Sequence, residues 1–152
     1  MNNNQFKEFC AKELKKRGFE KIKNCFYFVG QDLLCGIYLQ RSNYAKSYYV
    51  NYFYCIGNYN GATELPTYHD NDIEGRVCAM SKTQTYQGKH YMTPMIEYEE
   101  YTEDELRPFF DKEFKEKILP PLCQGKKYIL DNLNRLYFLT LNQNEVINKL
   151  KE

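Results

Sequence analysis

The residues best suited to acid–base or metal chemistry lie in one short polar stretch, residues 68 to 76. There His69 stands next to Asp70, and Asp72 follows two positions later. An imidazole beside carboxylates can act as an acid–base pair, and the same atoms can bind a divalent cation. Asp, Asn and Gly are also typical of an ordinary surface loop, which is the competing interpretation. A small hydrolase or metal-dependent enzyme using these three residues is therefore one functional hypothesis, although we assign no metal ligands.

The rest of the chain offers little catalytic chemistry. It has two histidines and three serines, and no serine lies in the G-x-S-x-G setting of a strained nucleophile. The segment Gly88-Lys89-His90 lacks the upstream glycine and the following Ser or Thr of a phosphate-binding loop, and neither G-x-G-x-x-G nor H-E-x-x-H occurs. We therefore expect no nucleotide, zinc or other cofactor.

Aromatic residues on the expected strands favour a second hypothesis, a binding surface. The chain has 15 tyrosines, 10 phenylalanines and no tryptophan. If Leu33 and its alternate neighbours face the helices, Tyr38 and Gln40 lie on the opposite side of the sheet. An uncovered aromatic face is a candidate for recognition or for a homodimer, whereas helices or loops that covered it would make it core. The candidate binding residues are Tyr38, Gln40, Ser42, Asn51, Tyr52, Tyr54 and Arg76.

Asn51 has two possible roles because it is polar among aromatic neighbours. It is either a buried amide with satisfied hydrogen bonds or a group that gives specificity, and the first is the commoner case.

Length and charge bound the class of protein. The 152 residues suit a single domain over 1–152, and the net charge of +1 gives no reason to expect a nucleic-acid or membrane partner. The first residues lack the pattern of a secretory signal, so we expect a cytoplasmic location. The six cysteines form no C-x-x-C pair, which is typical of small buried thiols in a reducing compartment.

Hydrophobic periodicity predicts an α+β domain. A helix over 4–17 carries Phe6, Phe9, Cys10 and Leu14 on one side, and Asn3 or Asn4 can cap it. Strands are predicted over 25–29, 33–41, 48–56 and 73–80, with a polar loop at 81–90 and a further edge strand near 90–98, which contains Pro94. This order favours two layers: an antiparallel meander of four or five strands, with the helices packed on it.

The last third of the chain is predicted to be helical. Thr102 and Glu105 offer a capping box, but Pro108 suggests that the helix proper begins nearer Glu105, and Pro120-Pro121 should end it. A helix over about 125–139 would bury Ile129, Leu130, Leu133, Leu136 and Tyr137. A last short helix begins near Asn144 and carries Val146, Ile147 and Leu150.

Four short motifs between Leu14 and Asn51 resemble a known family. They are Leu14-Lys15-Lys16-Arg17-Gly18-Phe19, Phe26-Tyr27-Phe28, Leu39-Gln40-Arg41-Ser42 and Tyr48-Tyr49-Val50-Asn51; the segment 72–76 is a weaker match. On these residues the first half of the chain is similar to the bacterial proteins grouped as domain of unknown function 4304. The resemblance implies no activity, but it directs attention to Gln40, Ser42 and Asn51.

The preferred hypothesis is a small, non-enzymatic binding or protein-interaction module that recognises a protein or a small molecule through the aromatic sheet face. The enzyme built on the 68–76 stretch is the alternative.

Overall fold

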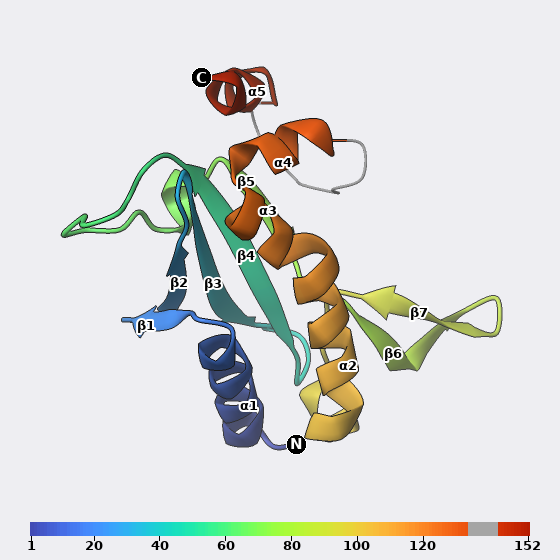
Figure 1. The fold of residues 1–152 in the computed structure, drawn as a ribbon. Coiled ribbons are helices and arrows are strands. Elements are labelled where there is room, and N and C mark those ends of the chain that lie inside the picture. The colour runs from blue at the N-terminus through green and yellow to red at the C-terminus, as the bar shows by residue number, and fades with distance from the viewer. Residues whose placement is uncertain (134–142) are drawn as a thin grey trace.

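The computed structural model describes residues 1–133 and 143–152. Its helices and strands follow one another along the chain as drawn in Figure 1. The strands are β1 (Glu20–Ile22), β2 (Cys25–Val29), β3 (Leu33–Arg41), β4 (Tyr48–Ile56), β5 (Ile73–Arg76), β6 (Ala79–Tyr86) and β7 (Lys89–Thr93). The helices are α1 (Asn3–Lys16), η1 (Tyr68–Asp70), η2 (Tyr98–Glu100), α2 (Glu103–Glu113), η3 (Phe114–Ile118), α3 (Leu119–Gln124), α4 (Lys126–Asp131) and α5 (Gln143–Lys151).

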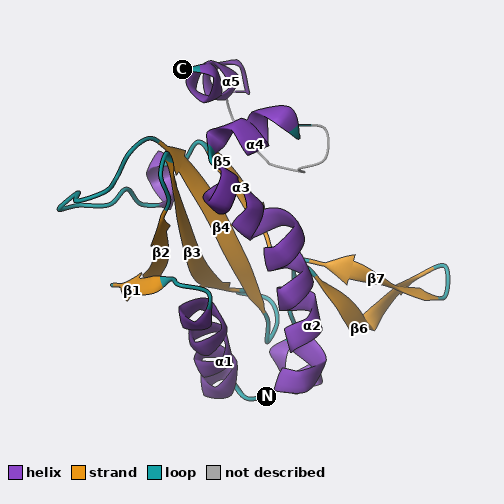
Figure 2. Ribbon diagram, viewed as in Figure 1, coloured by secondary structure: helices purple, strands orange, loops and turns teal. Residues whose placement is uncertain are grey.

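The main sheet is an antiparallel meander of five strands in the order β1-β2-β3-β4-β5. Strands β3 and β4 pair over their full length, from Leu33 opposite Ile56 to Arg41 opposite Tyr48. The α1 and α2 helices lie on the same side of this sheet (Figure 2). The predicted α+β class, with an N-terminal helix, an antiparallel sheet and C-terminal helices, is confirmed; the short edge strand β1 was not predicted.

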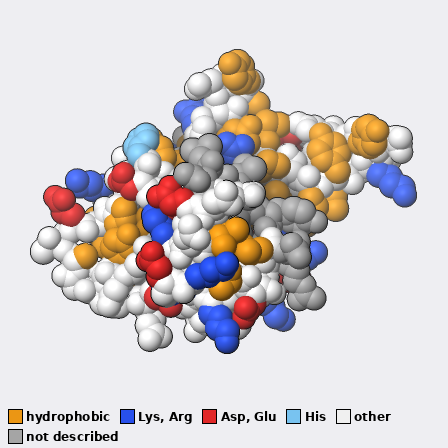
Figure 3. All heavy atoms as spheres, turned by 90° about the horizontal axis from the view of Figure 1, so that it is seen from above, with side chains coloured by type: hydrophobic (Ala, Val, Ile, Leu, Met, Phe, Trp, Pro, Cys, Tyr) orange, Lys and Arg blue, Asp and Glu red, His pale blue; other side chains and the backbone are white. Residues whose placement is uncertain are grey.

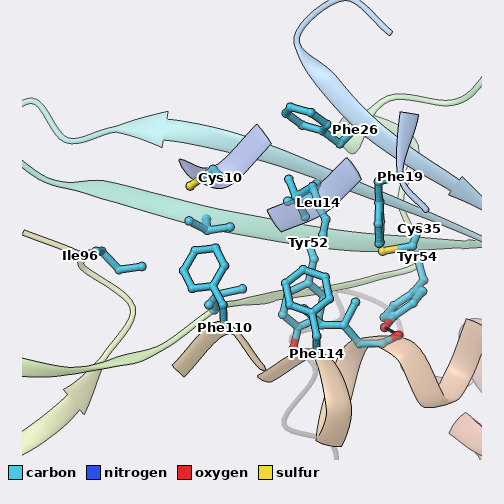
Figure 4. Close-up of a cluster of buried hydrophobic side chains, with 14 of the residues drawn as sticks. Cys10, Leu14, Phe19, Phe26, Cys35, Tyr52, Tyr54, Ile96, Phe110 and Phe114 are labelled. Atoms are coloured by element: carbon cyan, nitrogen blue, oxygen red, sulfur yellow. Dashed lines mark hydrogen bonds between the residues drawn. The ribbon is translucent and has the colours of Figure 1, made fainter. Parts of the chain in front are cut away.

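The main core lies between the helices and one face of the sheet (Figure 4). We call this side the helix face. Helix α1 contributes the predicted stripe of Phe6, Phe9, Cys10 and Leu14, each of which is buried. Phe110 of α2 packs edge-on against Phe9, with ring centroids 5.1 Å apart. The helices are thus held to the sheet mainly by large apolar side chains.

The caps explain where the two long helices begin. Asn2, one residue before the predicted caps, forms a capping box with Gln5 at the start of α1. The predicted box of Thr102 and Glu105 is present, but it starts α2 at Glu103, earlier than Pro108 suggested. Pro108 lies inside this helix and lacks the N–H that would bond the carbonyl of Asp104, whose side chain is strongly exposed.

The prediction that Pro120-Pro121 ends the helical run is wrong. The chain passes through the π-helical segment η3 and continues directly into α3, which has the two prolines in its first turn. The two prolines have no backbone N–H to donate, and they stand where the helical hydrogen-bond pattern changes from that of a π-helix to that of an α-helix.

The predicted strand over 73–80 and loop over 81–90 are corrected by a separate hairpin. Strand β5 ends at Arg76, and β6 and β7 form a two-stranded sheet joined at Gln87 and Gly88, which both have positive φ. This β6–β7 arm projects from the body (Figure 1) and exposes hydrophobic side chains, visible at the right of Figure 3. Beyond Ser81 the β6 strand buries neither face, so this part of its sequence lacks the alternation that marks a half-buried strand.

Helix α4 corresponds to the first part of the helix predicted over 125–139. Its Ile129 is buried, whereas Leu133 is exposed. Leu136 and Tyr137 lie outside the described residues. The last predicted helix is confirmed as α5, which buries Val146 and Leu150.

Two glycines of the sheet make room for large rings on β4. Gly36 lies opposite Phe53, and a Cβ added to it would come 2.1 Å from Cζ of that ring. On the other face, Gly75 lies opposite Tyr52, and an added Cβ would come 2.5 Å from the phenol oxygen. The β4 strand therefore fits between its neighbours only where they lack a side chain.

A buried carboxylate joins the two long helices. Glu13 of α1 is 3% exposed and accepts hydrogen bonds from Arg17 and from Arg107 of α2, at 2.7 and 2.9 Å. Arg17 also pairs with Asp111 of α2. Burial opposes the charge on Glu13, but hydrogen bonds from Lys16, Arg17 and Arg107 outweigh it and lower the pKa from 4.5 to about 2.

Replacing Gly36 with Ala should lower the free energy of unfolding by about 1–3 kcal/mol, because the new methyl group would overlap the Phe53 ring. Urea denaturation measures the loss. The matched control is the same substitution in a Phe53→Leu background, where the cost should be smaller. Equal costs in both backgrounds would show that the ring is not the obstacle.

The Glu13 carboxylate should make stability depend on acid pH. Its pKa is lower in the folded protein than in the unfolded chain, so the stabilisation is complete above about pH 4.5 and is lost as the pH falls toward 2. Glu13→Gln should cost on the order of 2 kcal/mol at pH 7 and flatten the pH dependence between about 5 and 2. The exposed Glu8→Gln on the same helix is the control; if it has the same effect, the Glu13 contacts do not explain the dependence.

Candidate binding site

The sheet face opposite the main helices carries a second, smaller cluster. We call it the open face, and its buried members are Tyr27, Leu34, Phe53 and Cys55. The 57–72 loop, which includes the short helix η1, lies against this cluster and adds Tyr59 and Leu65. Tyr38 is partly buried in this cluster, on the side of the sheet where the alternation of β3 predicted it.

An open groove of about 600 Å³ lies on this face, between the β1–β2 turn and the 57–72 loop. We call it the tyrosine groove, since Tyr27, Tyr38 and Tyr68 line it. Its other lining residues are Ile22, Lys23, Asn24, Cys25, Leu39, Ala62, Thr63, Glu64, Leu65 and Thr67. The volume lies in the range of ordinary ligand sites.

Ring contacts and one hydrogen bond fix the walls of the groove. Tyr38 of β3 stacks on Tyr68 of η1, with centroids 4.6 Å apart and planes 26° apart. The hydroxyl of Tyr27 donates to the carbonyl of Pro66 at 3.0 Å, which ties the 57–72 loop to β2. The loop and the sheet therefore share the walls of one site.

The groove presents few charges. Lys23 and Glu64 are its charged lining residues, and Cys25 contributes a thiol. Burial raises the pKa of the Cys25 thiol to about 11, so the thiol is protonated at neutral pH. Burial and the negative charge of Glu74 raise the pKa of Tyr38, which keeps its hydroxyl a hydrogen-bond donor.

Three of the predicted binding residues form a polar row across β3, β4 and β5 on the open face. The amide of Asn51 donates to Gln40 at 2.9 Å and accepts from Nε of Arg76 at 2.9 Å. The guanidinium of Arg76 also lies over the ring of Tyr49, 4.1 Å from its centroid. Asn51 is thus a buried amide with hydrogen bonds on both sides, while Gln40 and Arg76 are exposed.

Tyr52 and Tyr54 lie on the helix face, so the structure corrects their place in a site on the open face. They are 3% and 0% exposed. The hydroxyl of Tyr54 donates to the carbonyl of Ile118 at 2.8 Å, which anchors η3 to the sheet. Ser42 accepts from the N–H of Tyr44 at 3.2 Å within the turn before β4, a local turn contact.

The His69, Asp70 and Asp72 stretch lies at the end of the 57–72 loop. His69 and Asp70 are exposed, and His69 packs against Tyr68 with centroids 4.0 Å apart. Asp72 accepts from the N–H of Ile56 at 2.8 Å and from Lys149 of α5 at 2.6 Å. Among residues 1–133 and 143–152, no group of three or more His, Cys, Asp or Glu side chains is arranged to hold a metal ion.

Sequence reasoning missed several residues of the groove. Cys25 and Tyr27 share one face of β2, and the same alternation argument that selected Tyr38 could have found them. Leu65 and Tyr68 come from the 57–72 loop and its short helix η1, whose path over the sheet follows from tertiary contacts.

Fold and site together define a two-layer α+β domain with helices on one sheet face and an aromatic groove on the other. The chain belongs to the family described as domain of unknown function (DUF4304), whose model matches residues 10–123. The resemblance found in the first half of the sequence is thereby confirmed and extends as far as α3. Comparison with curated proteins and with solved structures found no significant match. Within the described part of the chain, no helix has the length and apolar character needed to cross a membrane.

The hydrogen bond between Tyr27 and Pro66 should hold the loop side of the groove in place. Tyr27→Phe removes only the hydroxyl and should cost about 1 kcal/mol of unfolding free energy. Limited proteolysis should then cut the 57–72 loop faster than in the unmodified protein. Tyr44→Phe, at a residue 98% exposed, is the control. Unchanged cleavage in Tyr27→Phe would contradict this role.

Proposed function

We propose that this protein is a non-enzymatic binding module and that the tyrosine groove is its ligand site. The observation that carries the proposal is the open groove lined by Tyr27, Tyr38 and Tyr68 on the sheet face opposite α1 and α2. Tyrosine supplies both apolar area and a hydroxyl donor, and it is enriched at recognition surfaces.

The chemistry of the groove supports binding better than catalysis. Its charged lining residues are one lysine and one glutamate, and its thiol is protonated at neutral pH, so it lacks an activated nucleophile. His69 and Asp70 are exposed and are not lining residues of the groove. A mostly apolar wall with a few polar groups is the usual composition of a ligand site.

The polar row beside the groove supplies a place for specificity. Gln40 and Arg76 are exposed at either end of the Asn51 amide, which holds both side chains through hydrogen bonds. A ligand that extends from the groove along β3 would meet these fixed donors and acceptors. Held side chains lose less conformational entropy on binding than free ones.

The cytoplasm is the proposed location. The six cysteines are unpaired thiols, and Cys10, Cys35 and Cys55 are buried among apolar side chains. Such thiols suit a reducing compartment.

Small aromatic probes test the proposal directly. Titration with indole and with p-cresol should shift the ring resonances of Tyr27, Tyr38 and Tyr68 in NMR spectra. Because the protein contains no tryptophan, indole fluorescence excited near 295 nm can follow the same binding without a protein background. Tyr38→Ala should weaken the binding roughly 10-fold or more, since it removes one wall of the groove.

The control is Tyr86→Ala, which removes the same side chain from a 71% exposed position on the β6–β7 arm. This variant should bind the probes as the unmodified protein does. Shifts centred on the arm, or equal losses in the two variants, would contradict the proposed site.

A further inference from the structure

The 57–72 loop already provides an internal example of what the open face binds. Leu65 packs against the buried cluster of the open face. The carbonyl of the next residue, Pro66, accepts a hydrogen bond from the hydroxyl of Tyr27. A leucine side chain on aromatic rings, followed by a prolyl carbonyl bonded to a tyrosine hydroxyl, is a peptide contact. This contact borders the groove, because Tyr27 and Leu65 are also lining residues.

The rest of the groove also has tyrosine rings and hydroxyls, but no segment of the described chain binds to them. Tyr38 and Tyr68 line it, and within residues 1–133 and 143–152 their hydroxyls have no hydrogen-bond partner. Tyr68 is 43% exposed. Two tyrosine donors beside an apolar wall are thus available to a second chain.

Resting on the proposed function, we propose that the tyrosine groove binds an extended, proline-containing peptide segment of a partner protein. Apolar side chains of the peptide lie against the rings of Tyr38 and Tyr68. The carbonyls of the peptide accept hydrogen bonds from the hydroxyls of these two tyrosines, as the carbonyl of Pro66 accepts one from Tyr27. Proline suits this site because it holds the chain extended before binding and leaves its carbonyls free.

The charges of the groove favour this occupant over others. A nucleotide or a nucleic acid would need cations for its phosphates, and the lining offers one lysine, Lys23, and one glutamate, Glu64. A neutral peptide backbone needs no such charge. The polar row of Gln40, Asn51 and Arg76 extends the same face for a longer chain.

Two pools of ten-residue peptides test the proposal. One pool has Leu-Pro at its centre and randomised flanks, and the other has Leu-Ala with the same flanks. Tyrosine ring shifts are measured with each pool, and the strongest peptides are then titrated singly. The Leu-Pro pool should bind more tightly, and Tyr38→Phe should weaken its best peptides roughly 3- to 10-fold, because it removes one hydrogen bond and keeps the ring. Tyr86→Phe on the arm should change nothing.

The possible failures are distinguishable. If indole and p-cresol still bind in the groove but the two pools bind equally or not at all, the peptide proposal is overturned and the binding function stands. If neither the peptides nor the small probes bind there, both are overturned. A dimer in sedimentation velocity whose formation protects Tyr38 and Tyr68 would make a second copy of the chain the occupant and would also overturn the proposal.

Discussion

Two large aromatic rings of β4 pack over glycines of the neighbouring strands β3 and β5, and the rest of the structure depends on this constraint. Phe53 covers Gly36 on the open face, and Tyr52 covers Gly75 on the helix face. A one-residue shift in the register of either neighbouring strand would place a side chain under a ring. It would also move every side chain of that strand to the other face of the sheet. This fit therefore fixes which tyrosines become core and which remain available at the surface.

The two faces are then covered by different means. On the helix face, Tyr48 and Tyr54 donate their hydroxyls to Asn3 of α1 and to Ile118 of η3, so the aromatic layer also anchors the helices. The ion pairs of Glu13 and Arg107 close the contact between α1 and α2. On the open face, the 57–72 loop covers part of the sheet. The tyrosine groove lies between this loop and the β1–β2 turn.

Local rules in the sequence predicted much of this fold. Periodicity placed α1, β2, β3 and β4, and the chain order predicted the meander; the family resemblance agreed with the matched model. The same alternation put Tyr38 on the open face. It did not decide between the two faces of β4, because both are aromatic, and so Tyr52 and Tyr54 were proposed for the binding surface although they are core. The path of the 57–72 loop, and with it Leu65 and Tyr68, follows from contacts distant in sequence.

Tyr38 and Tyr68 are accessible on one face of the sheet, whereas Tyr52 and Tyr54 are buried beneath the helices on the other. Paramagnetic relaxation of tyrosine ring resonances by a soluble, uncharged gadolinium chelate measures this most directly. The structure predicts strong broadening for Tyr68, intermediate broadening for Tyr38 and little for Tyr52 and Tyr54. Broadening of the Tyr52 and Tyr54 rings, or full protection of Tyr38 and Tyr68, would contradict the assignment of the two faces.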